Sequence, residues 1–102
     1  NLTSSCFTSI IKAANKSQLP LFGFVSDQAR QGAIAVVSRD YEQAGRDAVR
    51  LAAQILNGKD PKDIPFEFVS KTRLIINKKS AGKLNIAIPQ NIIRKADLII
   101  EP

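Results

Sequence analysis

The stretch PLFGFVSDQARQGAIAVV, residues 20–37, decides the fold class. Two apolar runs, residues 21–25 and 33–37, flank a polar segment at 27–31 and a glycine at position 32. Short continuous apolar runs bounded by turn residues are typical of buried strands in a parallel sheet. The stretch therefore predicts two buried strands joined by a brief helical turn.

An amphipathic helix is predicted on the amino-terminal side of this stretch. In residues 4–15, apolar side chains recur with helical spacing at Phe7, Ile10, Ile11 and Ala14, so one face should be buried. The cysteine Cys6 lies at the start of this stripe and is expected to be a buried structural thiol.

The strongest single element follows the stretch, as a helix over residues 41–57. Asp40 is the expected N-cap, and Gln43 stands three residues later, as in a capping box. Gly58 fits the left-handed residue after the helix. Gly45, inside the helix, is explained best by close packing of the helix against a sheet.

The rest of the chain predicts shorter elements. They are strands or extended crossing segments at 64–69 and 73–77, a helix at 78–84 stopped by Asn85, a helix at 89–96 and an apolar run at 98–100. The alternation of helices and strands predicts an α/β fold with a mostly parallel sheet. The sheet is incomplete, because no strand leads into the first helix.

Composition excludes several kinds of chemistry. The 102 residues contain one cysteine and no histidine, so an intrachain disulfide, a cysteine-cluster or histidine metal site and a Ser-His-Asp triad are excluded within this chain. No metal ligand set and no cofactor are predicted. No apolar run is long enough to span a bilayer, and the first residues lack the basic start and apolar core of a signal peptide.

The net charge of +6 raises the question of an anionic partner. The basic residues are scattered, with the densest groups at 71–73, 78–79 and 94–95, and no aromatic residue alternates with them as a stacking platform requires. A nucleic-acid-binding module is therefore the less favoured interpretation.

Two long segments carry a resemblance to a known family. They are PLFGFVSDQARQGAIA at 20–35 and RDYEQAGRDAVRLAAQILNGK at 39–59, and shorter matches continue through DIPFE, LIIN, AIP and RKAD. In this order they resemble the carboxy-terminal third of ABC-transporter substrate-binding proteins, the family that includes tryptophan- and phenylalanine-type binding proteins.

The resemblance implies a partial type I periplasmic-binding-protein fold, with two three-layer α/β/α lobes and a ligand cleft between them. Residues 1–38 would belong to the second lobe, 39–65 would form a helix and strand returning to the first lobe, and 66–102 would cross back and form the carboxy-terminal segment. The longer protein would be periplasmic or otherwise extracytoplasmic and membrane-associated, and would deliver a small solute to an ABC permease.

The resemblance also implies five candidate ligand-binding residues. Asn1 and Ser5 match the Asn and the last Ser of an Asp-Asn-Thr-x-x-Ser-like turn into a helix, where an amide and a hydroxyl can hold a carboxylate. Asp27 matches a position where an acidic residue meets a ligand amine. Asp40 could face the cleft, and Phe24 could form an apolar wall.

Each candidate also has a structural interpretation. Ser5, Asp27 and Asp40 could simply cap a helix or turn, and Phe24 could belong to the core. Leu2-Thr3-Ser4 and Arg39 depart from the pattern of the amino-acid binders, which leaves the ligand open.

Three other interpretations are open. They are an extracytoplasmic sensing domain of a signalling protein, a repressor core of the lactose-repressor type, and an enzyme using Asp27 and Asp40 as a carboxylate pair. The sequence predicts no enzyme. A partial fold should also expose apolar faces, which predicts a homodimer or swapped assembly of this chain.

Overall fold

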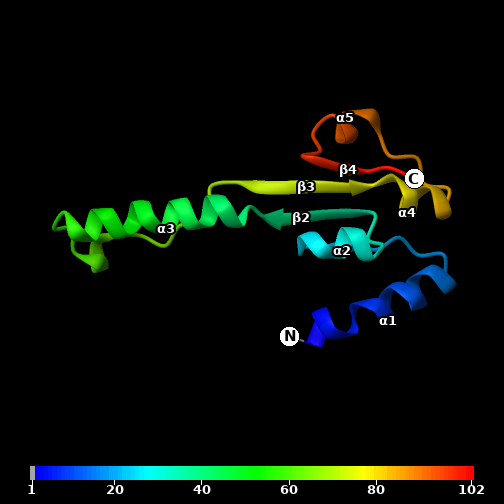
Figure 1. The fold of residues 1–102 in the computed structure, drawn as a ribbon, viewed down its shortest axis with the longest axis horizontal. Helices are drawn as coiled ribbons and strands as arrows, with labels where there is room; N and C mark the ends of the chain where they lie inside the picture. Colours follow the sequence, from blue (N-terminus) through cyan, green and yellow to red (C-terminus); the bar gives the residue numbers. More distant parts are fainter. Residues whose placement is uncertain (1) are drawn as a thin grey trace. The chain divides into compact units, whose positions relative to one another are not determined.

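The computed structural model describes residues 2–102 in Figure 1, with side chains from Ser5 onward. The chain divides into two compact units. Unit 1 combines Asn1–Ser38 with Arg73–Pro102, and unit 2 is Arg39–Thr72. The assignment of these units to two lobes of a binding protein stays a prediction.

A four-stranded sheet organises unit 1. Its strands are β1 (Phe22–Gly23), β2 (Ala35–Arg39), β3 (Thr72–Asn77) and β4 (Leu98–Ile100), in the order β1-β2-β3-β4. The outer pairs, β1 with β2 and β3 with β4, are parallel. The central strands β2 and β3 run in opposite directions (Figure 1). The predicted α/β class with a mostly parallel sheet is confirmed.

One face of the sheet is covered by α1 (Leu2–Lys16) and α2 (Ser26–Gln31), and the main core lies beneath them. The buried core cluster consists of Phe7, Ile11, Ala29, Ala33, Val36 and Ile75. Along β3, Ile76 follows Ile75 and therefore points to the opposite face. There it lines an apolar hollow together with Ile92 of α5 (Gln90–Ile93). Helices thus lie on both faces, in three layers.

Asn77, at the end of β3, joins several elements of unit 1. Its backbone N–H donates to the carbonyl of Ile34 at 2.8 Å, and its side-chain Nδ2 donates to the carbonyl of Ala29 at 2.7 Å. Its Oδ1 accepts from the N–H of Ser80 at 2.9 Å and so caps α4 (Lys78–Lys83). The nitrogen and the oxygen of this buried amide each have a partner, and these bonds fix α2 and α4 relative to the sheet.

Unit 2 consists of α3 (Tyr41–Leu56), a 3₁₀ turn (Pro61–Asp63) and an irregular segment that returns along the helix. The N-cap prediction is confirmed, since the Asp40 Oδ1 accepts from the N–H of Gln43 at 3.1 Å. The predicted left-handed stop is confirmed too, with φ = 97° at Gly58. No residue of unit 2 is buried within the described chain.

Polar contacts hold the returning segment of unit 2 to α3. The Asp47 carboxylate accepts from the N–H of Ser70 at 2.9 Å, from the Ser70 hydroxyl at 3.1 Å and from Nε2 of Gln43 at 3.0 Å. The Ser70 N–H, followed by the Gln43 side chain, lowers the pKa of Asp47 below its ordinary value of 3.8. Arg50, which lies about one turn after Asp47 on α3, forms an ion pair with Glu67 of the returning segment.

Several sequence predictions are wrong in detail. Cys6 is exposed, because Phe7 and Ile11 define the buried face of α1 and Cys6 lies beside it. Gln43 donates to Asp47 rather than completing a capping box. The position that a Cβ of Gly45 would take meets nothing within 4 Å, so no packing in the described chain explains that glycine.

The strands also differ from prediction. The structure assigns no strand to residues 64–69, and β1 is a short edge strand in which Phe22 is 65% exposed rather than buried. The left-handed stop at Asn85 is confirmed, with φ = 54°.

Candidate functional site

The loop between β1 and α2 is held by one buried side chain. Gln28 is 3% exposed, and its Oε1 accepts from the backbone N–H of Phe24 at 2.9 Å and of Val25 at 3.1 Å. Gly23 leaves room for this amide, because a Cβ there would lie 2.6 Å from the Gln28 Oε1. Ser26 and Asp27 are thereby fixed at the carboxyl end of β1.

A second contact ties this loop to the end of β2. The hydroxyls of Ser26 and Ser38 are 2.8 Å apart, and Ser38 is buried. Because β1 and β2 are parallel, their carboxyl ends lie at one edge of the sheet. Open α/β sheets bind ligands outside the carboxyl ends of their strands. The loop is therefore placed where a ligand site is expected.

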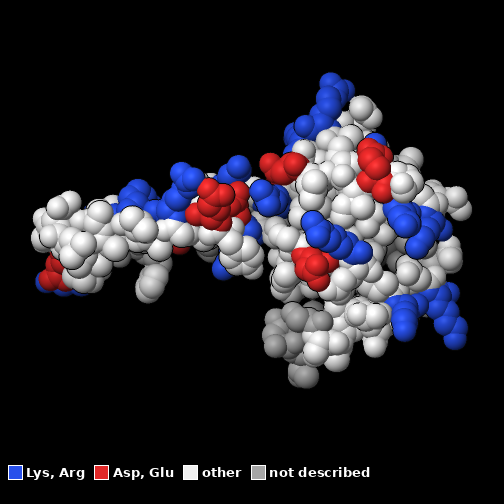
Figure 2. All heavy atoms as spheres, viewed as in Figure 1, with Lys and Arg blue, Asp and Glu red and all other residues white. Residues whose placement is uncertain are grey.

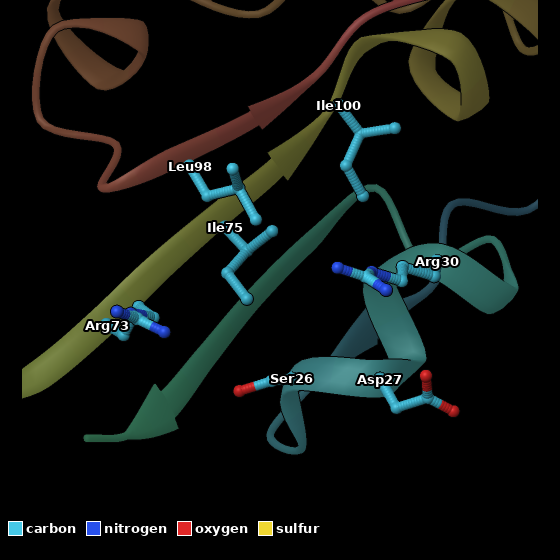
Figure 3. A pocket seen from close by; sticks show the side chains of 7 residues that line it. All are labelled: Ser26, Asp27, Arg30, Arg73, Ile75, Leu98 and Ile100. Carbon is cyan, nitrogen blue, oxygen red and sulfur yellow. The ribbon is translucent and has the colours of Figure 1, made fainter. Parts of the chain in front are cut away.

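Next to this loop lies an open hollow of about 270 Å³. It is lined by Ser26, Asp27, Arg30, Arg73, Ile75, Leu98 and Ile100 (Figure 3). The isoleucines and Leu98 come from β3 and β4 and form an apolar floor. The polar residues stand around that floor, on α2 and at the start of β3.

The two arginines of the hollow give it its electrostatic character. In Figure 3 Arg30 and Arg73 lie on opposite sides of the hollow, with Ile75 between them in this view. Neither makes an ion pair in the described part of the chain. The Asp27 carboxylate points away from them and accepts a hydrogen bond from Nε2 of Gln31. The hollow therefore combines positive charge with an apolar floor.

A second hollow, of about 320 Å³, lies on the opposite face of the sheet. Its lining includes Phe22, Ile34, Ile76 and Ile92, and it presents almost no polar atoms. Small-molecule sites need a few well-placed polar groups to orient the ligand. This apolar hollow is therefore the weaker candidate for a solute site.

Of the five predicted ligand residues, the structure brings Asp27 into the lining of the arginine-flanked hollow. Phe24 is 61% exposed, so it is not a core residue, but it does not line the hollow. Ser5 is exposed on α1 and also lies outside the lining. Asn1 falls outside the described residues.

Asp40 belongs to unit 2, where it lines a separate polar hollow of about 200 Å³. Besides capping α3, its carboxylate lies 3.8 Å from the Nζ of Lys71. The structural interpretation of Asp40 is therefore confirmed as a cap, and its contact with a ligand stays a prediction, like those of the other four residues.

Sequence reasoning missed Arg30 and Arg73. The group 71–73 was visible as a basic cluster, but nothing in the spacing connects position 73 with position 30. Only the sheet brings them together, since α2 follows β1 while Arg73 lies on β3. The sequence signal that could have indicated Arg73 is its place at the start of a predicted strand.

Within residues 2–102, no group of three or more histidine, cysteine, aspartate or glutamate side chains is placed to hold a metal ion. None of the helices described is both long and apolar enough to cross a membrane. On the face shown in Figure 2, basic side chains form several separate groups rather than one continuous patch.

Comparison with known proteins places the chain in a family. The family model for ABC transporter substrate binding protein matches residues 1–100. The chain is 33% identical over 86 residues to the tyrosine-binding protein of Clostridioides difficile (strain R20291), a match that covers 84% of this chain. It spans only 25% of that relative's length.

Solved structures of similar proteins share the fold of this chain. A conserved domain protein from Vibrio cholerae aligns with a TM-score of 0.76 and 33% identity, over 95% of this chain and 33% of that one. An ABC domain from Streptococcus pneumoniae in complex with L-Trp aligns with a TM-score of 0.76 and 28% identity, over 98% of this chain and 35% of that one.

The description of the family and the names of the Clostridioides difficile and Streptococcus pneumoniae relatives all refer to the binding of a substrate or ligand. The match extends over nearly the whole chain, and the sheet and helices described above are shared with the solved relatives. The chain thus belongs to the family of ABC transporter substrate-binding proteins.

Proposed function

We propose that the protein of which this chain is a part is the substrate-binding component of a bacterial ABC importer. It binds an amino acid or a similar small polar solute in a cleft between two lobes, outside the cytoplasm, and delivers it to an ABC permease. The observation that carries the proposal is family membership over residues 1–100. The relatives named for tyrosine and solved with L-Trp support an amino-acid-sized ligand.

The division of the chain supports a two-lobe arrangement. Unit 1 contains the sheet and the hollow, and unit 2 is inserted between β2 and β3. In this proposal unit 1 is part of the second lobe, and unit 2 is a part of the first lobe reached by two crossing connections. The chain spans about a third of its solved relatives, so the rest of the first lobe belongs to the longer protein.

Of the predicted ligand residues, Asp27 has the best-supported backbone position, while its carboxylate accepts a hydrogen bond from Gln31. It stands at the carboxyl end of β1, and the buried Gln28 and the Ser26–Ser38 contact hold its loop in place. A rigid loop at a strand end is the usual support for a ligand group. Asn1, Ser5, Phe24 and Asp40 remain proposed contacts without such support.

A thermal-shift screen of the longer protein tests the function. Amino acids, nucleosides and small carboxylates are added singly, and a ligand at 100 times its dissociation constant should stabilise the protein by about 2.7 kcal/mol. Asp27→Asn should weaken the response to the best ligand. Asp63→Asn is the matched control, because Asp63 lies in the 3₁₀ turn of unit 2.

A cooperative melting transition with no shift for any compound would count against the importer component. It would favour a ligand outside these classes, or the sensing and interaction interpretations. An equal loss of response in both aspartate variants would remove Asp27 from the site while leaving the function in place.

A further inference from the structure

The side chain of Gln28 determines the conformation of the loop between β1 and α2. The pairing of β1 with β2 ends at Gly23. The next two backbone N–H groups, of Phe24 and Val25, both donate to the Gln28 Oε1, at 2.9 Å and 3.1 Å. A side chain that accepts from nearby backbone groups competes with the sheet ladder. The end of β1 and the turn into α2 therefore depend on one amide.

Gly23 belongs to the same arrangement. A Cβ at this position would lie 2.6 Å from the Gln28 Oε1, closer than a side chain can approach. The amide reaches the backbone of the loop because residue 23 has no side chain. Gly23 and Gln28 thus encode the conformation of the loop together.

Gln28 is placed to act on the loop but not on a ligand. It is 3% exposed and does not line the hollow beside α2, whereas the neighbouring Ser26 and Asp27 do. Its hydrogen bonds are made within residues 24–28, so further parts of the longer protein can cover them but are not needed to form them.

The order of this loop has a consequence for affinity. A loop that is ordered in the free protein does not have to be ordered when a ligand binds. Fixing the backbone of one residue corresponds to about a tenfold change in a dissociation constant. Without the Gln28 acceptor, the two successive residues Phe24 and Val25 lose the bonds that hold them.

We propose that Gln28 is a positioning residue for solute binding. Its buried amide fixes residues 24–27 before the solute arrives and raises the affinity without contacting the solute. The proposal adds a residue to the solute-binding function proposed above and rests on that function.

Calorimetric titration of the longer protein tests this role. The probes are L-tyrosine, L-tryptophan and every compound that shifts the melting transition in the screen. Gln28→Met keeps an unbranched side chain of similar length but offers only a weak acceptor. It should weaken the binding of these probes by about 10- to 100-fold. Gly23→Ala, which displaces the amide without removing it, is the second variant and should weaken binding too.

Ile76→Ala is the matched control for lost stability. Ile76 is 1% exposed and lines the hollow on the opposite face of the sheet, so its substitution destabilises the chain without touching the loop. Melting curves give a titration temperature at which all variants are folded. A purely structural role of Gln28 would lower the melting temperature and leave the affinity of the folded protein unchanged.

Hydrogen exchange of the solute-free protein gives a second readout. The amides of Phe24 and Val25 should be protected from exchange, although the Phe24 residue is 61% exposed. In Gln28→Met this protection should fall by about tenfold or more relative to Ile76→Ala, because the bonds to Oε1 are lost.

The outcomes separate the two proposals. If Gln28→Met binds a solute as tightly as the unchanged protein, the positioning role is overturned and the solute-binding function stands. An equal loss of affinity in Ile76→Ala, or unprotected loop amides in the unchanged protein, has the same meaning. Absence of binding by every compound rejects a solute of these classes and, with it, the role of Gln28 in binding one.

Discussion

Units 1 and 2 reach their structures by different physical means. Every buried apolar side chain among the described residues lies in unit 1, including Val36 and Ile76 with at most 1% exposure. In unit 2, α3 has a strong apolar stripe but no buried residue, and Leu56, Phe66 and Phe68 are almost fully exposed. Unit 2 is held by capping, by ion pairs and by the Asp47–Ser70 contacts.

The two units differ in how much of their apolar surface is packed. Isolated helices in water are marginal, and most helical stability in proteins comes from packing an apolar face. The apolar stripe of α3 therefore lacks, within the described residues, the packing that usually stabilises a helix. Unit 1 has a core of its own, although Phe22 on the edge strand β1 remains exposed.

The largest effect we expect concerns assembly of the 102-residue chain on its own. The exposed apolar face of unit 2 should drive the predicted dimer or swapped assembly, as expected for large apolar patches. Replacing Leu56, Phe66 and Phe68 together by Ser should weaken association by about 1000-fold, because each contributes about 1.5 kcal/mol or more when buried. Light scattering over a range of concentrations measures this. A folded monomer at high concentration before any substitution would contradict the idea.

The next effect compares one side chain from each unit. Ile76→Ala should lower the free energy of unfolding by about 2–5 kcal/mol, because Ile76 is 1% exposed and the cavity cannot collapse fully. Val49→Ala in unit 2 should change it by less than about 0.5 kcal/mol, because Val49 is 70% exposed. Urea unfolding of the chain measures both. Similar changes for the two variants would show that unit 2 is packed after all.

Two glycines should respond to alanine with opposite sign. At Gly23 the new Cβ would lie 2.6 Å from the Gln28 Oε1 and 3.0 Å from Val36, so Gly23→Ala should destabilise by about 1–3 kcal/mol. At Gly45 it meets nothing, so Gly45→Ala should stabilise α3 by about 0.5–1 kcal/mol. Thermal melts report both changes. If Gly45→Ala destabilised the longer protein but not the 102-residue chain, a part of the longer protein would have to pack closely against α3 at Gly45.

The smallest effect is a pH dependence in unit 2. The pKa of Asp47 is lowered on folding, chiefly by the Ser70 N–H. Its contribution to stability is therefore complete above the ordinary value of 3.8 and disappears as the pH falls through the lower folded pKa. NMR titration should show the Ser70 amide shift following the Asp47 carboxylate in that acidic range. Asp47→Asn should abolish this titration, and a Ser70 amide that shifts in both proteins would contradict the assignment.

The sequence predicts the local features of the chain well. Residues 41–57 were expected as a helix and α3 spans Tyr41–Leu56, because the Asp40 cap and Gly58 are local signals. Apolar runs were less reliable. Phe22 and Phe24 belong to a run that predicts a buried strand, yet both are exposed, because burial depends on neighbours that no local pattern describes.

The candidate site was predictable only in part. Asp27 follows a strand, so its place at the carboxyl end of β1 could be expected from the sequence. The presence of Arg30 and Arg73 in the same hollow could not be expected from the sequence. It requires β3 to lie beside β2 in the sheet, although all of unit 2 separates the two strands in the sequence. The exposure of Cys6 could not be predicted from the sequence either. Phe7 and Ile11 enter the core and set the rotation of α1, which leaves Cys6 exposed.

The insertion of unit 2 into unit 1 has a consequence for synthesis on the ribosome. Ile75 completes the core cluster that begins at Phe7 and Ile11, but it is translated only after all of unit 2. At about 5–20 residues per second, α1, α2 and the first two strands wait about 2–7 s for their missing partner. During that interval their apolar faces are open to chaperones and to premature association. A cleavage within unit 2 of the finished protein, in contrast, should leave two pieces that remain bound through the core of unit 1.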